Sequence, residues 1–216
     1  MTRDAATDPG SSVGLPTVVR AKLGKLRTPQ RIQDFINAIS WNHAPDGHSA
    51  RSVVGVLAAN RANCVEAAFV AGYALWLAGE PPLLMDMGAD RGDVDHVVAL
   101  FRRRGHWGAI SKSNSPFLRY RDPIHRTLRE LAISFFPQYV KRRRKTLRTY
   151  SVPVDLRRFA PALWVTHPDF CHDVVDALTA SRHFTILPPG VGTADLRAID
   201  EIEDRSNGLK EFPAPG

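Results

Sequence analysis

The chain contains very little cysteine: Cys64 and Cys171 are the two thiols among 216 residues. Two cysteines cannot build a disulfide framework, and a reducing compartment would keep both thiols free. Each cysteine therefore needs an explanation of its own, as a small core residue, a metal ligand or a nucleophile.

Long apolar segments are also missing. The longest run covers residues 67–79, only 13 residues, whereas a helix that crosses a bilayer needs about 20. The first 12 residues are polar and lack the apolar centre of a signal peptide. We therefore expect a soluble, cytoplasmic protein with no membrane partner, and residues 67–79 are typical of a buried helix.

The sequence has no Gly-rich loop of the kind that binds phosphates. Gly190 and Gly192 stand alone after two prolines, a pattern that predicts a turn. We expect no organic cofactor.

Acidic residues are too few to balance the basic ones, with 22 Asp and Glu against 29 Lys and Arg and a net charge of +7. Much of the excess lies in two runs, residues 102–104 and 141–145. Such runs can attract acidic partners, including nucleic acid. No nucleic-acid-binding motif accompanies either run, so we interpret them as a solvated hairpin tip and a solvated loop. A basic nucleic-acid-associated protein remains an alternative.

The domain organisation follows from length and local composition. Residues 1–15 are rich in Gly, Ser, Asp and Thr and predict a disordered tail, and the Pro-rich end, 211–216, predicts frayed chain. The length suits one domain. We place that domain at residues 16–156, and the extension 157–216 either belongs to it or forms a small appendage. The oligomeric state is left open.

Helix signals dominate the first third of the chain. Thr28 and Pro29 form an N-cap and a first-turn proline. Asn63 caps a second helix, and Glu66 completes a capping box. This helix runs to Gly79 and is apolar almost all round, as a central buried helix would be.

Strand signals follow, and helices return at the end. The predicted strands are 83–87, a hairpin of 96–102 with 107–111, then 117–121, and an edge strand over 147–154. The predicted later helices are 126–139, one that begins near Asp169, and 193–205. Helices and strands are therefore segregated, which favours an α+β fold over alternating βαβ units.

The residues that point to chemistry begin with Cys64. A helix N-terminus presents free N–H groups that favour a thiolate and can stabilise an oxyanion. His96, at the start of a predicted strand, is the candidate base. Asp122 is the first candidate for the group that orients its ring, with Asn114 and Ser111 as alternatives.

Four short stretches resemble the core of bacterial transglutaminase-like proteins: 63–68, 95–101, 105–110 and 122–123. The resemblance covers roughly residues 29–155. It implies a papain-like fold in which Cys64 opens a helix packed on an antiparallel sheet, with a C-terminal helical extension. The acid departs from the family pattern, in which an Asp follows the hairpin Trp by a few residues. Ser111 occupies about that place here, so the third triad residue stays open.

The resemblance also implies an activity. Cys64 would attack an amide of a peptide or protein substrate, and His96 would move the proton. Water as acceptor gives hydrolysis, and an amine gives acyl transfer; the sequence does not choose between them. A catalytically silent papain-like module that binds a peptide or protein is the alternative. No metal is implied.

A second group of possible ligands lies near the end of the chain: His167, Cys171, His172 and His183. The spacing of the first two would place them on one helical face, as in some zinc sites. Pro168 argues against a helix that starts before it, and no further Cys/His pair follows. We expect Cys171 to be a small buried residue of a C-terminal helix and predict no metal site.

Overall fold

An antiparallel sheet of five strands forms the centre of the protein, for which the computed structural model describes residues 15–43 and 49–214. The predicted tail lies outside these residues, apart from Leu15. The strands run in the order β10-β3-β4-β5-β6. Their bounds are β3 (Leu83–Met87), β4 (His96–Arg103), β5 (His106–Ile110), β6 (Arg121–His125) and β10 (Val154–Asp155). The α+β class predicted from the sequence is confirmed.

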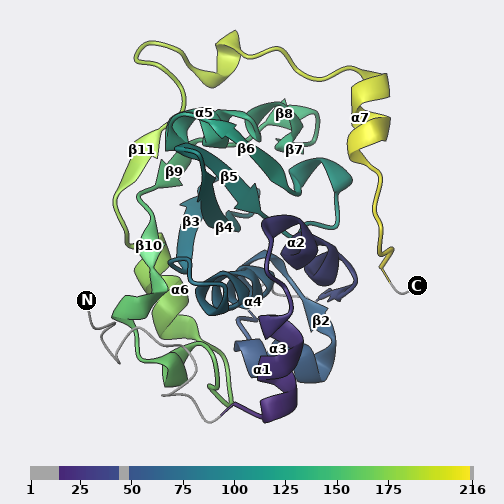
Figure 1. The fold of residues 1–216 in the computed structure, drawn as a ribbon. Coiled ribbons are helices and arrows are strands. Elements are labelled where there is room, and N and C mark those ends of the chain that lie inside the picture. The colour runs from purple at the N-terminus through teal and green to yellow at the C-terminus, as the bar shows by residue number, and fades with distance from the viewer. Residues whose placement is uncertain (1–14, 44–48, 215–216) are drawn as a thin grey trace.

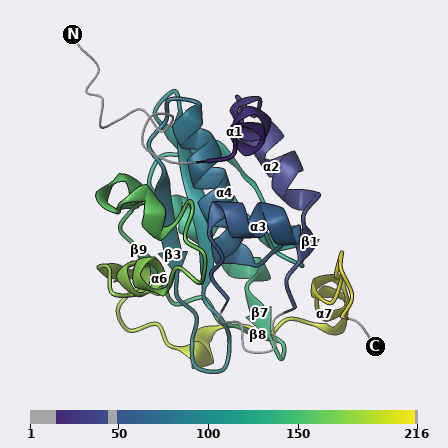
Figure 2. The same cartoon turned by 90° about the horizontal axis from the view of Figure 1, so that it is seen from below.

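Helices cover both faces of this sheet, most of them on one side (Figures 1 and 2). The crowded face carries α1 (Thr17–Gly24), α2 (Pro29–Asn37), α3 (Val53–Ala59), α4 (Cys64–Leu77) and α6 (His172–Thr179). The opposite face carries α5 (Leu128–Ile133). Among the described helices, none combines the length and apolar character needed to cross a bilayer.

Alternation along β4 divides the core into two parts. Val97, Ala99 and Phe101 pack with α4, in what we call the α4-side core. Val98 and Leu100 pack with α5 and the residues after it, in the α5-side core. Because successive side chains of a strand point to opposite faces, the phase of β4 decides which neighbour each residue meets.

Helix α4 begins as the sequence predicted. The Asn63 side chain accepts a hydrogen bond from Glu66 N at 3.0 Å, and the Glu66 carboxylate accepts one from Asn63 N at 2.9 Å. The buried Glu66 carboxylate also accepts from Asn42 and from the backbone and guanidinium of Arg51. These bonds compensate the desolvation of Glu66 and hold the first turn of α4, which begins at Cys64.

Three small sheets and several short helical turns complete the fold. The paired strands are β1 (Ser40–Trp41) with β2 (Arg61–Ala62), β7 (Val140–Lys141) with β8 (Arg144–Lys145), and β9 (Thr149–Ser151) with β11 (His183–Thr185). The 3-10 turns are η2 (Pro116–Leu118), η3 (Phe136–Gln138), η4 (Leu156–Arg158), η5 (Pro161–Leu163) and η6 (Thr193–Asp195). The last helix is α7 (Glu201–Asn207).

Prolines account for several differences from the predicted elements. The strand predicted over 117–121 is wrong: Pro116 opens η2 there, and β6 begins only at Arg121. The helix predicted over 126–139 is short: α5 ends at Ile133, and Pro137 has no N–H to donate to the Ile133 carbonyl. Pro153 likewise separates β9 from β10.

The C-terminal residues pack on the same core as the rest of the chain. Trp164, Val165, Val174 and Leu178 are buried in the α4-side core. After β11 the chain crosses the molecule to α7 (Figure 1). The fraying predicted from residue 211 onward is wrong for its first two residues, since Asn114 accepts hydrogen bonds from the backbones of Glu211 and Phe212.

Candidate functional site

The Cys64 thiol lies at the point where the first turn of α4 meets the beginning of β4. Its Sγ atom is 4.0 Å from the carbonyl oxygen of Asp95, the residue before His96. The backbone N–H of Val97, the residue after His96, also interacts with the thiol. The fold therefore brings residues 64 and 96, which are distant in sequence, to one place.

The electrostatics of the thiol differ from the expectation. Burial raises the pKa of Cys64 above its ordinary value, and the Asp86 carboxylate raises it further. The N–H groups of Val97 and Val65 lower the pKa but do not compensate the loss of solvent. The prediction that the helix N-terminus lowers the thiol pKa is wrong, because desolvation outweighs the helix. The thiol is protonated in the resting protein near neutral pH.

The His96 ring occupies the α5 side of β4. Its centroid is 6.2 Å from that of Phe135 and 6.4 Å from that of Tyr139. Burial lowers its pKa to about 4, the Leu118 carbonyl acts in the opposite direction, and Arg121 lowers it further. The ring is therefore neutral near pH 7.

The two ring nitrogens of His96 have different surroundings. Nε2 lies 2.6 Å from Ser111 Oγ and 3.2 Å from the Leu118 carbonyl oxygen. Ser111 Oγ donates to the same carbonyl at 2.9 Å, so the hydroxyl bridges the ring and the loop after β5. Nδ1 makes no hydrogen bond within the described part of the chain, and no hydrogen bond joins the ring to Cys64 Sγ there. Nδ1 is therefore the ring nitrogen that the described residues leave unengaged.

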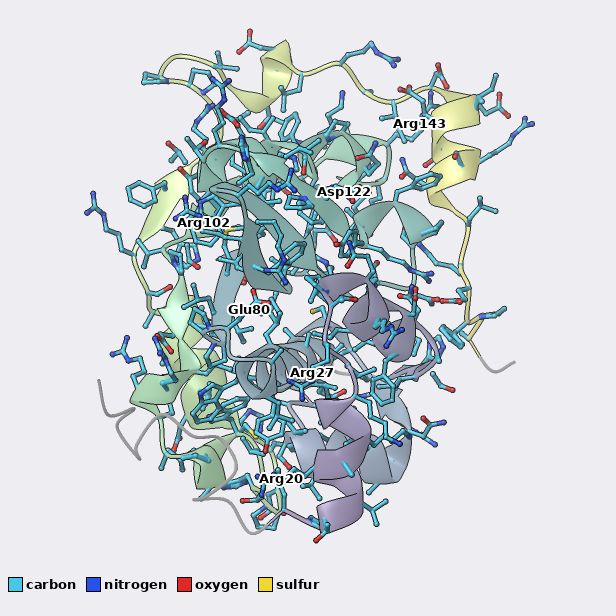
Figure 3. All side chains as sticks on the ribbon, in the orientation of Figure 1. Arg20, Arg27, Glu80, Arg102, Asp122 and Arg143 are labelled. Atoms are coloured by element: carbon cyan, nitrogen blue, oxygen red, sulfur yellow. The ribbon has the colours of Figure 1, made fainter. Side chains whose placement is uncertain are left out.

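Of the three candidates for the orienting group, Ser111 is the one in contact with His96. Asp122, the first candidate, is exposed on β6 (Figure 3), and assigning it to this role was wrong. Successive residues of a strand point to opposite faces of the sheet. Arg121 places its guanidinium over the Phe135 ring, 3.9 Å from the ring centroid, so Asp122 points away from His96. Asn114 borders the pocket near His96, but its side-chain amide is bonded to the backbone of Phe212.

Two further titratable residues, Asp86 and His183, lie at this site and were not assigned to it from the sequence. Asp86 is 3% exposed on β3, directly across from Val97 on the face that carries α4. His183 Nε2 lies 3.2 Å from its carboxylate. Burial raises the pKa of Asp86, Asp95 adds to the rise, and His183 opposes it. The available signal was a carboxylate inside an otherwise apolar strand.

Cys64 and His96 open into one pocket of about 930 Å³. Its walls come from β3, β4, the loop after β5, the loop before β7 and helix α6. The volume is at the upper end of the range of small-molecule and peptide-side-chain sites. Tyr139 closes one side, and its hydroxyl donates to the Val94 carbonyl. A substrate in this pocket would reach both the thiol and the imidazole.

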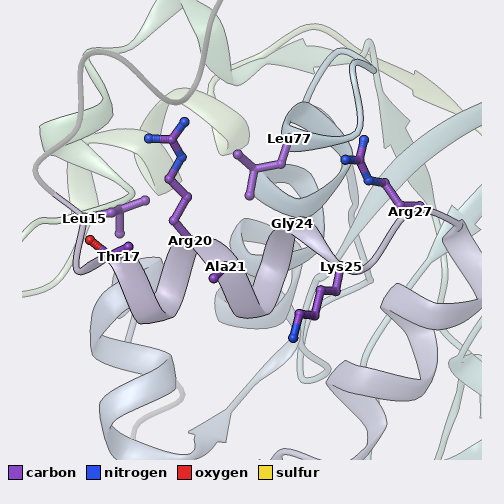
Figure 4. Close-up of a pocket in the computed structure, with 8 residues that line it drawn as sticks. All are labelled: Leu15, Thr17, Arg20, Ala21, Gly24, Lys25, Arg27 and Leu77. Carbon is purple, nitrogen blue, oxygen red and sulfur yellow. The ribbon is translucent and has the colours of Figure 1, made fainter.

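A second hollow, of about 480 Å³, lies at the other end of α4 (Figure 4). It borders Leu77, the last residue of the helix, whereas Cys64 is the first. Cationic side chains surround it, among them Lys25 and Arg27. A helix of 14 residues separates it from the thiol, so it takes no part in the site.

The other cysteine is a core residue, as predicted. Cys171 is 2% exposed in the α4-side core, and burial raises its pKa to about 12. The alternative ligand group is dispersed: His183 pairs with Asp86, and the His172 ring packs on Phe170. Among the described residues, no three His, Cys, Asp or Glu side chains are arranged to hold a metal ion.

No protein-family model matches the chain, and no curated protein sequence matches it.

Proposed function

We propose that this protein catalyses thiol-dependent acyl transfer or hydrolysis on amide groups of peptides or proteins, on a papain-like core of the transglutaminase kind. One observation carries the proposal. The Cys64 thiol, at a capped helix N-terminus, lies against the backbone on both sides of His96, and both side chains open into one large pocket.

The electrostatics favour a neutral starting pair. Cys64 is a thiol and His96 is a neutral imidazole. As Sγ attacks the carbonyl carbon, the S–H proton passes to Nδ1 of His96, and the new oxyanion is stabilised by N–H groups at the start of α4. The imidazolium returns the proton to the leaving amine. Water or an acceptor amine then releases the acyl group by the same steps in reverse.

The role of Ser111 is to hold the ring. Its hydroxyl engages Nε2 and so leaves Nδ1 as the ring nitrogen that can act as the base. A hydroxyl stabilises an imidazolium less than a carboxylate does, and the low pKa of His96 agrees with this. We therefore expect a slow enzyme in comparison with one that has an acid at this position.

A second candidate is the catalytically silent module that binds a peptide. The raised thiol pKa and the lack, among the described residues, of a carboxylate hydrogen-bonded to the His96 ring favour it. The two candidates share the pocket and differ in whether the thiol becomes acylated.

The test uses an activated ester. The full chain is mixed with p-nitrophenyl acetate, the nitrophenolate burst is recorded, and the acetylated residue is mapped by mass spectrometry. We expect acetylation of Cys64, no burst in Cys64→Ala, an unchanged burst in Cys171→Ala, and a burst slowed by about 100-fold in His96→Gln. Equal labelling of both cysteines, or a His96→Gln burst at the wild-type rate, would leave the silent module as the function.

A further inference from the structure

A small cationic pocket lies directly beside the Cys64 pocket. Its volume is about 200 Å³, and its lining includes four basic side chains: Arg91, Lys141, Arg142 and Arg144. Asp93 forms the wall between the two pockets, because it lines the larger one while its neighbour Gly92 lines the smaller one.

Most of these cations have no anionic partner. Asp90, the acid in the lining, is bonded to Arg148 at 2.5 Å, and Lys141 is 3.8 Å from Asp93. Within the described residues, no carboxylate pairs with Arg91, Arg142 or Arg144. All three are exposed. A hollow that collects unpaired positive charge attracts anionic groups.

The backbone of the β7–β8 hairpin adds an independent observation. Its two turn residues, Arg142 and Arg143, have φ of 50° and 64°. A two-residue turn of this kind favours Asn-Gly, because side chains are strained at positive φ. The β4–β5 hairpin has Arg104 and Gly105 at the same two places. The two arginines at the β7–β8 tip thus occupy strained positions, which is compatible with a need for charge at that tip.

The hairpin is also held in place. Arg143 Nε donates to the Ile199 carbonyl at 3.0 Å, and Ile199 N donates to the Arg143 carbonyl at 3.0 Å. Figure 3 labels Arg143 beside α7. Because these bonds hold the turn residue Arg143, the backbone that carries its neighbours Arg142 and Arg144 is in place before any ligand arrives, which lowers the entropic cost of binding.

We propose that this cationic pocket binds acidic side chains of a peptide whose reacting amide lies at Cys64. The proposal rests on the proposed function only for what happens at Cys64, and the docking itself is independent. The described residues of its lining include no aromatic ring on which a nucleic-acid base could stack. A carboxylate-bearing side chain fits the small volume and the fork geometry of the arginines.

The test measures binding without turnover. The full chain with Cys64→Ala is titrated into two fluorescein-labelled peptides, one with a glutamine next to a run of glutamates and one with glutamines in place of those glutamates. We expect tighter binding of the acidic peptide and a Kd that rises with salt. In the Cys64→Ala chain, the further substitution Arg142→Asn should raise the Kd for the acidic peptide about threefold. Arg142→Asn together with Arg144→Gln should raise it about tenfold.

The matched control is Arg104→Asn, which also replaces an exposed arginine at φ 50° in a hairpin turn. It relieves the same strain and removes the same charge, so its Kd should stay at the parent value. Equal affinity for both peptides, an equal loss in Arg104→Asn, or tighter binding of a labelled single-stranded or duplex oligonucleotide would overturn the proposal. Binding that depends on Arg142 together with an ester burst that is absent would keep the docking site and reject the enzyme.

Discussion

His96 Nε2 and Ser111 Oγ are 2.6 Å apart, so the ring is held by a hydroxyl rather than by a carboxylate. A carboxylate would favour the protonated ring, whereas a hydroxyl is indifferent to its charge. Burial, which disfavours the charged ring, is then the largest effect, and it lowers the pKa of His96 to about 4. This single contact links the stability of the fold to the pH at which the site can work.

The first prediction concerns acid stability. The pKa of His96 is about 4 in the folded protein and 6.5 ordinarily. Between these values the unfolded chain binds the additional proton, so this contribution to stability is complete above pH 6.5 and is lost as the pH falls toward 4. We expect a loss of about 2–3 kcal/mol between pH 7 and pH 4.5 that is absent in His96→Gln.

Urea unfolding at the two pH values measures this difference. Val98→Ala is the control, since it leaves a cavity on the same face of β4 and removes no titrating group. It should be less stable at both pH values while keeping the wild-type pH dependence. A His96→Gln variant with the same acid loss as the wild type would contradict the assignment.

The second prediction concerns the carboxylate near the thiol. Asp86 adds to the raised pKa of Cys64, after the larger effect of burial. Asp86→Asn keeps the shape and removes the charge, so the thiol pKa should fall. We expect alkylation of Cys64 by iodoacetamide at pH 8 to become about two to three times faster.

The matched variant is Glu80→Gln, which removes an acid that pairs with Arg103 and lies outside the pocket lining. Its alkylation rate should equal that of the wild type. A slower reaction in Asp86→Asn would show instead that the carboxylate helps to remove the thiol proton.

The third prediction concerns the packing of β5. A Cβ on Gly108 would lie 2.4 Å from Phe101 Cζ and 2.8 Å from the Arg121 carbonyl oxygen. The carbonyl belongs to the neighbouring strand β6 and cannot move without breaking the pairing. Gly108→Ala should therefore cost about 2–3 kcal/mol in the free energy of unfolding.

Gly24→Ala is the control for this change. Gly24 ends α1, and a Cβ there meets nothing within 4 Å. The substitution should leave stability unchanged or raise it by up to about 1 kcal/mol, since it restricts the unfolded chain. Chemical denaturation compares the two variants, and similar midpoints would contradict the packing argument.

Local signals account for the parts of the structure that the sequence predicted correctly. The Asn63–Glu66 capping box involves neighbours in one turn, and the hairpin that contains Arg104 and Gly105 is also local. Both are set by residues close together in the chain, so no knowledge of packing is needed. The position of Cys64 at a helix N-terminus follows from the capping box alone.

Properties that depend on contacts between distant parts of the chain could not be predicted from the sequence. The α5-facing orientation of His96 depends on the phase of β4, which is fixed only when Phe135 and Tyr139 cover that face. The thiol pKa depends on how much chain covers it. Lys112 is a further example: it is 1% exposed and caps the end of α2 through the carbonyls of Ile36 and Ile39.

The hydrogen bonds between Asn114 and Phe212 have a practical consequence for anyone who handles this protein. Lys210, two residues before Phe212, borders the thiol pocket, so the stretch of chain around it is one of the surfaces that a substrate meets. Leu15 borders the hollow at the far end of α4. Dyes, affinity handles and immobilising linkers attached at Leu15 should therefore disturb the thiol pocket less than those attached at Lys210.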